Sequence, residues 1–236
     1  MIKRLAIIPA RSGSKRIKNK NIRNFHGKPI ISYIIAEAIS SGLFHKIHVS
    51  TDSEKIYDIA CQYNLEFDFY RDPNLCDDIT PIMPVLKFVL EKFIKMRINF
   101  DEVWCLMPCS PMITSFDLTE AAKIMRRNKS ICPLLSVSEY NVPVEWAFKK
   151  NEADQLEPLN PGMFSIRSQD LSPSYFDAGA FSVFPSEWIL NSNNAGSDKG
   201  FIGYPLSKLQ SVDIDTEEDW FLAEALYQFK KNKSLK

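Results

Sequence analysis

A basic loop close to the N-terminus carries side chains that could bind phosphate groups. Five cations fall within ten residues and are interleaved with small and amide side chains: Arg11, Lys15, Arg16, Lys18 and Lys20, among Ser12, Gly13, Ser14, Asn19 and Asn21. Small residues let backbone N–H groups approach a phosphate, and cations neutralise its charge. The loop has neither the Walker pattern nor the glycine pattern of dinucleotide-binding folds. A solvated basic loop without a ligand would have the same composition, so this alternative stays open.

An acidic run near the C-terminus, SVDIDTEEDW at 211–220, could hold a cation. Residues two apart in a strand face the same way, so Asp213 and Asp215 would share one face while Val212 and Ile214 point into the core. Two neighbouring carboxylates repel each other unless a cation lies between them. Mg²⁺ typically takes one or two carboxylates and completes its shell with water and substrate phosphates. The run therefore predicts a magnesium site on Asp213 and Asp215.

The same acidic run also has a purely structural interpretation. It could be an amphipathic edge strand that leads into a helix, with Asp215 or Thr216 as the N-cap. Asp219 would then close a capping box. The residue pattern alone favours neither interpretation over the other.

The elements that would position these two groups alternate between strands and helices. Apolar runs predict strands at 5–9, 46–51, 67–70, 103–107, 131–137, 180–184, 202–204 and 212–215. Helical periodicity and end signals predict helices at 29–41, 53–63, 81–95, 115–127 and 217–230, with Thr80 as the cap of the third. This order indicates an α/β fold, a three-layer α/β/α arrangement of the Rossmann-like type with a mostly parallel sheet. The basic loop would leave the carboxyl end of a strand, where ligands of such sheets bind.

The alternation breaks between residues 138 and 178, where the chain is rich in proline and aromatic residues. Runs this long without regular structure are uncommon in compact domains unless they serve a function. We therefore expect a single domain over 1–236 with an insertion at 138–178 that binds substrate, a partner subunit or both. The insertion carries more large apolar surface than a monomer normally exposes, which favours a homodimer. These apolar residues are Val142, Val144, Trp146, Phe148, Met163, Phe164, Tyr175 and Phe176.

The composition argues against several classes of protein. The chain has 236 residues with 29 basic and 29 acidic side chains, so no net field attracts nucleic acid or an acidic membrane. No run approaches the roughly 20 apolar residues that span a bilayer. The five cysteines are odd in number and form no CxxC pair, so we expect buried, reduced thiols in a cytoplasmic protein.

Together these motifs resemble those of the CMP-sugar synthetases, the acylneuraminate cytidylyltransferase family. The loop IPARSGSKRIKNKN at 8–21 is similar to the family pattern IPAR-x-GSK-x(4)-KN, and VDIDT at 212–216 resembles the family's metal-binding motif. STD at 50–52, RDPNLCDD at 71–78 and PCSP at 108–111 follow in the family order. The resemblance covers nearly the whole chain and implies a nucleotidyltransferase fold.

Within the family, the stretch FSIRSQDLSPSYFDAGAFSVF at 164–184 is most similar to the pseudaminic acid cytidylyltransferases, which carry RSQDLP followed by Y-x-DAG. The loop at 107–111 departs from the QPTSP-like run of many relatives. Met107 cannot make the polar contact of a glutamine, and Cys109 replaces a hydroxyl group with a weaker donor. We therefore expect the contacts of this loop with base or sugar to differ from those of the relatives.

The resemblance implies a reaction in which the anomeric hydroxyl of the sugar attacks the α-phosphorus of CTP and pyrophosphate leaves. It implies that Mg²⁺ on Asp213 and Asp215 bridges the α-phosphate, and that Arg11 and Lys20 hold the triphosphate. The product, CMP-pseudaminic acid, would supply glycosylation of surface glycans or flagellin. The implied residues are catalytic Arg11, Lys20, Asp213 and Asp215; nucleotide-binding Ala10, Arg11, Gly13, Ser14, Lys20, Asn21, Arg71 and Asp78; and sugar-binding Arg167, Gln169 and Asp177.

Other functions share parts of this pattern. A synthetase for another sialic-type sugar, such as N-acetylneuraminic or legionaminic acid, would use the same loop and acids. A sugar-1-phosphate nucleotidyltransferase would share the fold, and a nucleotide-sensing module would bind CTP without turnover. Arg167 also has a structural alternative, because it could pair with Asp170 or Asp177 as a local salt bridge.

Overall fold

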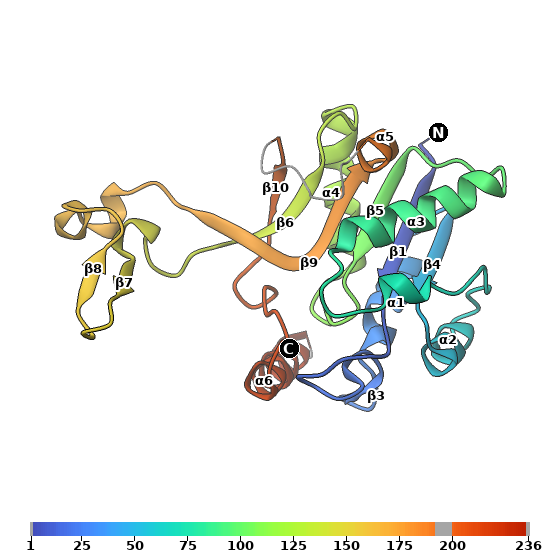
Figure 1. The fold of residues 1–236 in the computed structure, drawn as a ribbon, viewed down its shortest axis with the longest axis horizontal. Helices are drawn as coiled ribbons and strands as arrows, with labels where there is room; N and C mark the ends of the chain where they lie inside the picture. Colours follow the sequence, from blue (N-terminus) through green and yellow to red (C-terminus); the bar gives the residue numbers. More distant parts are fainter. Residues whose placement is uncertain (1, 192–199, 235–236) are drawn as a thin grey trace.

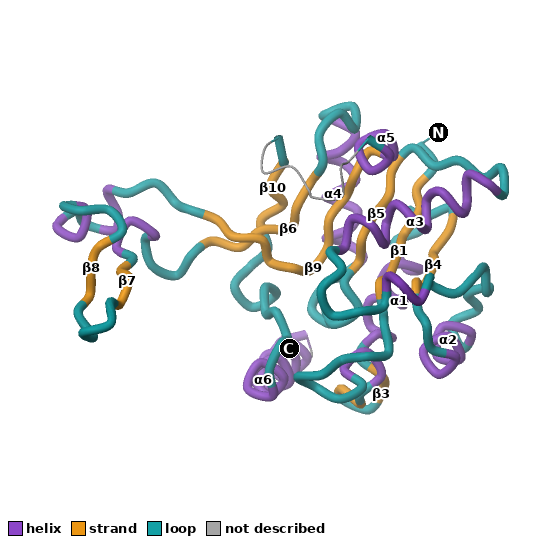
Figure 2. The backbone as a smooth tube through the Cα atoms, viewed as in Figure 1, coloured by secondary structure: helices purple, strands orange, loops and turns teal. Residues whose placement is uncertain are grey.

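The computed structural model describes residues 2–191 and 200–234, which form a central sheet with helices on both faces (Figures 1 and 2). The six strands follow the order β10-β6-β9-β5-β1-β4, and β9 runs antiparallel to both of its neighbours. The other pairings in the sheet are parallel, so the predicted mostly parallel sheet is confirmed. The strands are β1 (Arg4–Pro9), β4 (Lys46–Ser50), β5 (Glu102–Leu106), β6 (Leu134–Glu139), β9 (Tyr175–Pro185) and β10 (Ile202–Pro205).

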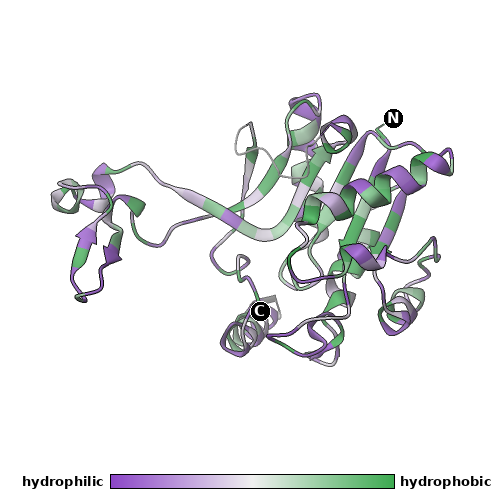
Figure 3. Cartoon of the chain, viewed as in Figure 1, coloured by the Kyte–Doolittle hydropathy of each residue, from purple (hydrophilic) through white to green (hydrophobic). Residues whose placement is uncertain are grey.

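Alternating strand residues build one apolar core on each face of the sheet. Ala6 and Ile8 pack with α1, α2 and α4, whereas Leu5 and Ile7 pack with α3 and α5. The strands therefore carry long hydrophobic stretches (Figure 3), as strands buried on both faces do. The helices are α1 (Ile31–Ser40), α2 (Glu54–Cys61), α3 (Ile82–Lys95), α4 (Ser115–Arg127), α5 (Ser186–Leu190) and α6 (Glu217–Ser234). The predicted three layers are confirmed.

A third apolar cluster joins the basic loop to the C-terminal helix α6. Ile17 of the loop, Ile214 of the acidic run and Trp220 of α6 are buried in this cluster. The ring of Phe25, in the small hairpin of β2 (Asn24–Phe25) and β3 (Lys28–Pro29), meets that of Trp220 edge-on at 5.6 Å. Because Ile17 and Ile214 are both buried here, the polar residues beside them are held close together.

Residues 140–174, together with the adjoining ends of β6 and β9, form an arm that projects from the sheet (Figure 1); the predicted insertion bounds, 138–178, include buried Ser138 and Ala178, which belong to the body. The ends of β6 and β9 leave the body as a paired ribbon, in which Ser138 is opposite Phe176 and Glu139 is opposite Tyr175. A second, short hairpin lies toward the far end of the arm. Its elements are β7 (Phe148–Lys150) and β8 (Leu156–Pro158), with 3-10 turns at Val144–Trp146, Met163–Ser165 and Ser168–Asp170.

Two of the strands predicted from the sequence are wrong. Residues 67–70 form no strand; they run beside β4, held by a 3.1 Å contact between His48 Nδ1 and Asp68 and by a 2.8 Å bond from the Arg71 N–H to the Thr51 carbonyl. Residues 212–215 keep the alternation of a strand but pair with no strand that the structure describes. Side-chain contacts hold this second segment instead.

Two smaller expectations are also corrected. Thr80 does not cap α3 with its side chain; its N–H donates to Asp77 at 2.6 Å, and Pro81 occupies the N-cap. The five cysteines are free, but only Cys105 is buried and Cys61 is exposed, because α2 turns other residues toward the core. No helix in the described ranges is both long and apolar enough to cross a membrane.

Candidate active site

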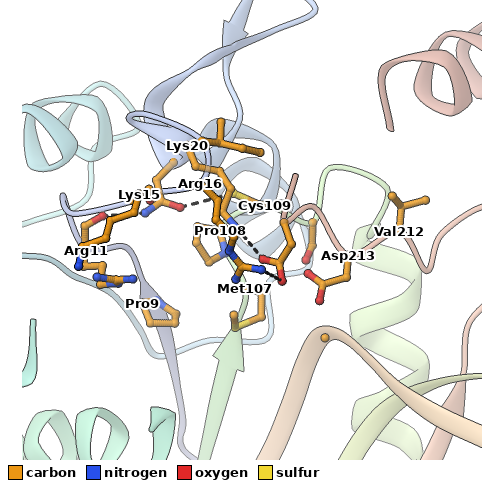
Figure 4. Close-up of a pocket in the computed structure, with 16 residues that line it drawn as sticks. Pro9, Arg11, Lys15, Arg16, Lys20, Met107, Pro108, Cys109, Val212 and Asp213 are labelled. Atoms are coloured by element: carbon orange, nitrogen blue, oxygen red, sulfur yellow. Dashed lines mark hydrogen bonds and ion pairs between the residues drawn. The ribbon is translucent and has the colours of Figure 1, made fainter. Parts of the chain in front are cut away.

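A pocket of about 190 Å³ lies where β1 and β5 end, and segments far apart in the sequence line it (Figure 4). The basic loop contributes Arg11, Ser14, Lys15, Arg16, Ile17, Lys20 and Asn21. The remaining walls are Pro9 of β1, the 107–110 turn after β5, Gly179 of β9, and Val212, Asp213 and Asp215. The cations and the acids predicted from the sequence therefore face one cavity.

The basic loop is anchored to the body and is not merely solvated. The carboxylate of Asp52, which follows β4, accepts bonds from the Ser12 N–H at 2.8 Å and from the Ser12 hydroxyl at 2.7 Å. The side-chain amide of Asn21 donates to the Arg11 carbonyl at 2.9 Å. Buried Ile17 fixes the far side of the loop in the third cluster. This anchoring argues against the solvated-loop alternative.

Two cations of the loop contact the acidic run directly. Lys20 Nζ donates to the Ile214 carbonyl at 2.6 Å and lies 3.3 Å from Asp215 Oδ1. Arg16 Nη1 lies 2.8 Å from Asp215 Oδ2. Lys18, in contrast, is exposed and does not line the pocket. The structure thus joins the two motifs that the sequence places almost 200 residues apart.

The two carboxylates of the acidic run both border the pocket. Ile214 between them is buried, so Asp213 and Asp215 share the opposite face, as predicted. The predicted capping box is present as well, since Thr216 N donates to Asp219 at 2.7 Å and Asp219 N donates to the Thr216 hydroxyl at 3.3 Å. The metal-site and capping interpretations are therefore compatible.

The environment of Asp213 favours a nearby cation. Asp213 is exposed at the pocket wall, but the surrounding protein partly desolvates its carboxyl; this raises the pKa of the group above its ordinary value, and the charge of Asp215 raises it further. Asp213 has no hydrogen bond or ion pair with any residue that the structure describes. A divalent cation beside these two oxygen donors would stabilise their ionised forms. Two carboxylates plus phosphate oxygens match the ligands that Mg²⁺ takes, so the donor set fits this ion.

The sequence profile of the cytidylyltransferases matches residues 5–147. This chain belongs to the cytidylyltransferase family. A pseudaminic acid cytidylyltransferase of Campylobacter jejuni is 36% identical over 96% of this chain and 97% of its own length. A CMP-N,N'-diacetyllegionaminic acid synthase of Legionella pneumophila is 32% identical, again over 96% of this chain and 97% of its own length. Family membership makes the chain a nucleotidyltransferase.

Two solved structures show that the fold is also shared. A CMP:2-keto-3-deoxy-manno-octonic acid synthetase complexed with CTP has a TM-score of 0.71 at 15% identity and covers 97% of this chain and 99% of its own. A 4-diphosphocytidyl-2C-methyl-D-erythritol synthase of Anaerococcus prevotii has a TM-score of 0.64 at 14% identity, with 96% and 99% covered. The nucleotidyltransferase fold implied by the motifs is confirmed.

Cys109, one of the two departures from the family pattern, still supplies a polar contact. Its thiol donates to Asn21 Oδ1 at 3.4 Å, on the same amide group that holds the Arg11 carbonyl. Desolvation of the partly buried Cys109 thiol raises its pKa to about 12, so it stays protonated and can donate. Met107 also lines the pocket and presents a thioether there.

The remaining nucleotide-binding candidates lie around the pocket and do not line it. Ala10 is buried and donates its N–H to the Ser50 carbonyl at 2.9 Å. Buried Arg71 donates to the same carbonyl at 2.7 Å and to the Ser50 hydroxyl at 3.1 Å. Asp78 pairs with Arg11 and Lys15. Gly13 is exposed in the middle of the basic loop.

The sugar-binding candidates are divided between the body and the arm. Arg167 and Gln169 lie on the arm, and Arg167 pairs with Asp170 at 2.8 Å and 3.2 Å. The arm points away from the body of its own chain (Figure 1). Asp177 lies where β9 enters the body and accepts a 2.9 Å bond from the N–H of Gly179. Of the three, Asp177 alone is close in sequence to a residue that lines this pocket.

Two further residues, for which no role was predicted, shape the site. Asp52 holds the basic loop through Ser12. Its place in the STD run at 50–52 was the sequence signal for such a role. Gly179 has a φ of +61°, which glycine adopts without strain. A Cβ added there would lie 3.7 Å from the Asp213 carboxyl carbon. The DAG run therefore bends β9 beside the acids.

Proposed function

We propose that this chain joins the CMP group of CTP to pseudaminic acid and releases pyrophosphate. The observation that carries the proposal is the full-length similarity to the pseudaminic acid cytidylyltransferase of Campylobacter jejuni. The pocket supports it, because basic groups suited to a triphosphate lie opposite a pair of carboxylates. The 164–184 stretch is also similar to this branch of the family.

The side chains of the pocket would act through position and charge. Arg11 and Lys20 would hold the triphosphate and stabilise the negative charge that develops on the departing pyrophosphate. Ser14 and Asn21, which line the same wall, would add neutral polar contacts. Lys20 is well placed for this role, since its bond to the Ile214 carbonyl fixes the ammonium group between loop and acids.

Asp213 and Asp215 would hold Mg²⁺. When bound, this ion would neutralise charge at the α-phosphate and favour attack by the anomeric hydroxyl of the sugar. The protein would contribute two oxygen donors, and Gly179 would leave room for phosphate and sugar beside them. Arg16 and Lys20 would limit the repulsion between the two carboxylates.

The arm would complete the sugar site in a second copy of the chain. Arg167, whose side chain is 71% exposed, is suited to the carboxylate of the sugar by its two-pronged geometry. The arm exposes many large apolar side chains, among them Val142, Leu156, Phe164 and Tyr175. Such a surface is more than a monomer usually leaves in water. We therefore propose a homodimer in which each arm covers the other subunit.

We infer a cytoplasmic setting from the substrates and the thiols. CTP and five free cysteines suit the reducing cytoplasm. The product would supply glycosylation of surface glycans or flagellin, and the similarity to a post-translational flagellin modification protein of Campylobacter coli supports this role.

A pyrophosphate-release assay with a panel of nine-carbon and eight-carbon keto-acid sugars tests the proposal. We expect the highest kcat/KM with pseudaminic acid and no release without a sugar. A clear preference for N-acetylneuraminic acid would overturn the sugar assignment. The second candidate is legionaminic acid, which the full-length similarity to the Legionella pneumophila enzyme favours. Binding of CTP without turnover of any sugar would instead indicate a nucleotide sensor.

A further inference from the structure

The single carboxylate of Asp78 is shared between two cations of the basic loop, Arg11 and Lys15. Asp78 Oδ1 lies 2.5 Å from Arg11 Nη1, and Oδ2 contacts Lys15 Nζ. Both cations line the pocket, whereas Asp78 does not. The bonds from Lys15 and Arg11 hold the pKa of the Asp78 carboxyl below its usual range, so the group is ionised at neutral pH.

The basic loop does not need Asp78 to keep its backbone in place. Asp52 holds the Ser12 N–H and hydroxyl at 2.8 Å and 2.7 Å, and Asn21 holds the Arg11 carbonyl at 2.9 Å. The contacts of Asp78, in contrast, are to the charged ends of the Arg11 and Lys15 side chains. The pairing with Asp78 therefore orients the charged groups of Arg11 and Lys15. Other residues hold the backbone of the loop.

A triphosphate and the Asp78 carboxylate would compete for the same two cations, Arg11 and Lys15. Both are anions, and like charges repel, so a phosphate that approaches Arg11 must displace the carboxylate or share the guanidinium group with it. Asp215 also pairs with loop cations, but it lies beside Asp213, where a metal ion could use it. Asp78 has no such second role among its described contacts.

We propose that Asp78 is an internal competitor of the triphosphate that sets the affinity of this site. The proposal rests on the CTP site assigned above. Asp78 would weaken the binding of CTP and would also ease the release of pyrophosphate, because the product leaves from the same cations. The carboxylate would thus lower the affinity for CTP and speed turnover through faster release of pyrophosphate. This role has the opposite sign from that of a direct nucleotide contact, whose removal weakens binding.

The test is calorimetric binding of CTP, and separately of inorganic pyrophosphate, to the full chain and to Asp78→Asn. The amide keeps the shape of the side chain but removes its charge. We expect both ligands to bind about two- to fivefold more tightly to the variant, the range typical of partly exposed ion pairs. The gain should shrink at high salt, since screening weakens exposed ion pairs. Inhibition of turnover by pyrophosphate should strengthen by a similar factor.

Asp77→Asn is the matched control, because Asp77 is the adjacent carboxylate and bonds to the N–H groups of Ile79 and Thr80 at 3.1 Å and 2.6 Å. It should not tighten the binding of either ligand. Asp78→Ala provides a second variant, and melting curves verify that each variant is folded. Unchanged or weaker binding of CTP and pyrophosphate to both Asp78 variants would overturn the proposal. Failure of the unmodified chain to bind CTP would instead overturn the assigned CTP site.

Discussion

The pocket and the arm differ in how completely one chain organises them. In and around the pocket, Lys20, Asn21, Asp52 and Asp215 contact partners from distant parts of the same chain. On the arm, Arg167 pairs only three residues away, and the aromatic rings contact one another at the surface. The body therefore holds the groups expected to handle phosphate, while the arm presents exposed groups with mostly local contacts.

This difference has a physical origin. The pocket residues follow buried strands or flank buried apolar side chains such as Ile17 and Ile214, so the core determines their positions. The arm is a narrow ribbon with a short hairpin and has too little volume for a core of its own. A partner surface would supply the burial that the arm cannot provide.

The largest loss of activity should come from substitution of the paired acids, Asp213 and Asp215. Asp213→Asn or Asp215→Asn should lower kcat by about a hundredfold or more, as loss of a charge-stabilising contact does. Melting should show a folded protein, because neither side chain packs in the core. Asp58→Asn, at an exposed position on α2, is the control and should keep full activity in the pyrophosphate-release assay. Near-normal turnover in both acid variants would remove the metal assignment.

Substitution of Arg11 or Lys20 in the basic loop should cause the next largest loss of activity. Arg11→Ala and Lys20→Ala should each raise the KM for CTP by about tenfold or more, because a cation held against a phosphate forms a strong charge-assisted bond. Lys18→Ala should change it by less than about twofold, as exposed charges contribute little. Steady-state kinetics with varied CTP measures all three. Equal effects at the three positions would favour the solvated-loop alternative.

The arm should affect assembly more than nucleotide binding. Phe164 and Phe116 are similarly exposed, at 66% and 68%, but Phe164 lies on the arm and Phe116 on α4 of the body. Phe164→Glu should shift the chain toward monomers in light scattering and lower turnover of the sugar, while CTP binding persists. Phe116→Glu should remain dimeric. A monomeric unmodified chain at working concentrations would contradict the proposed dimer.

The smallest effect should come from Cys109. Cys109→Ser keeps a donor for Asn21 and should stay within about twofold of the unmodified chain in the KM for CTP. Cys109→Ala removes the donor and should raise this KM by about two- to fivefold, the lower part of the range of one ordinary hydrogen bond, because a thiol is a weak donor. An alanine variant that matches the serine variant would show that the contact with Asn21 does not position the loop.

The sequence allowed the layers and much of the pocket to be predicted, because local signals determine them. Helix α4 begins and ends where predicted, since Thr114 and Asp117 form a capping box at its start. The segment at 212–215 was misread because its apolar alternation matches that of a strand, while strand formation also needs a neighbour to pair with. The bond between Ser12 and Asp52 joins residues 40 apart, and local patterns carry no information about such contacts.

Direct observation of the product is the most direct test of the proposed transfer of CMP to the sugar. The chain is incubated with CTP, Mg²⁺ and pseudaminic acid, and the phosphorus signals are followed by NMR. We predict that pyrophosphate and a new phosphodiester appear in equal amounts, that omission of the sugar stops both, and that Asp213→Asn forms neither at a comparable rate. Release of free CMP without a sugar phosphodiester, or no consumption of CTP with any keto-acid sugar, would contradict the assignment.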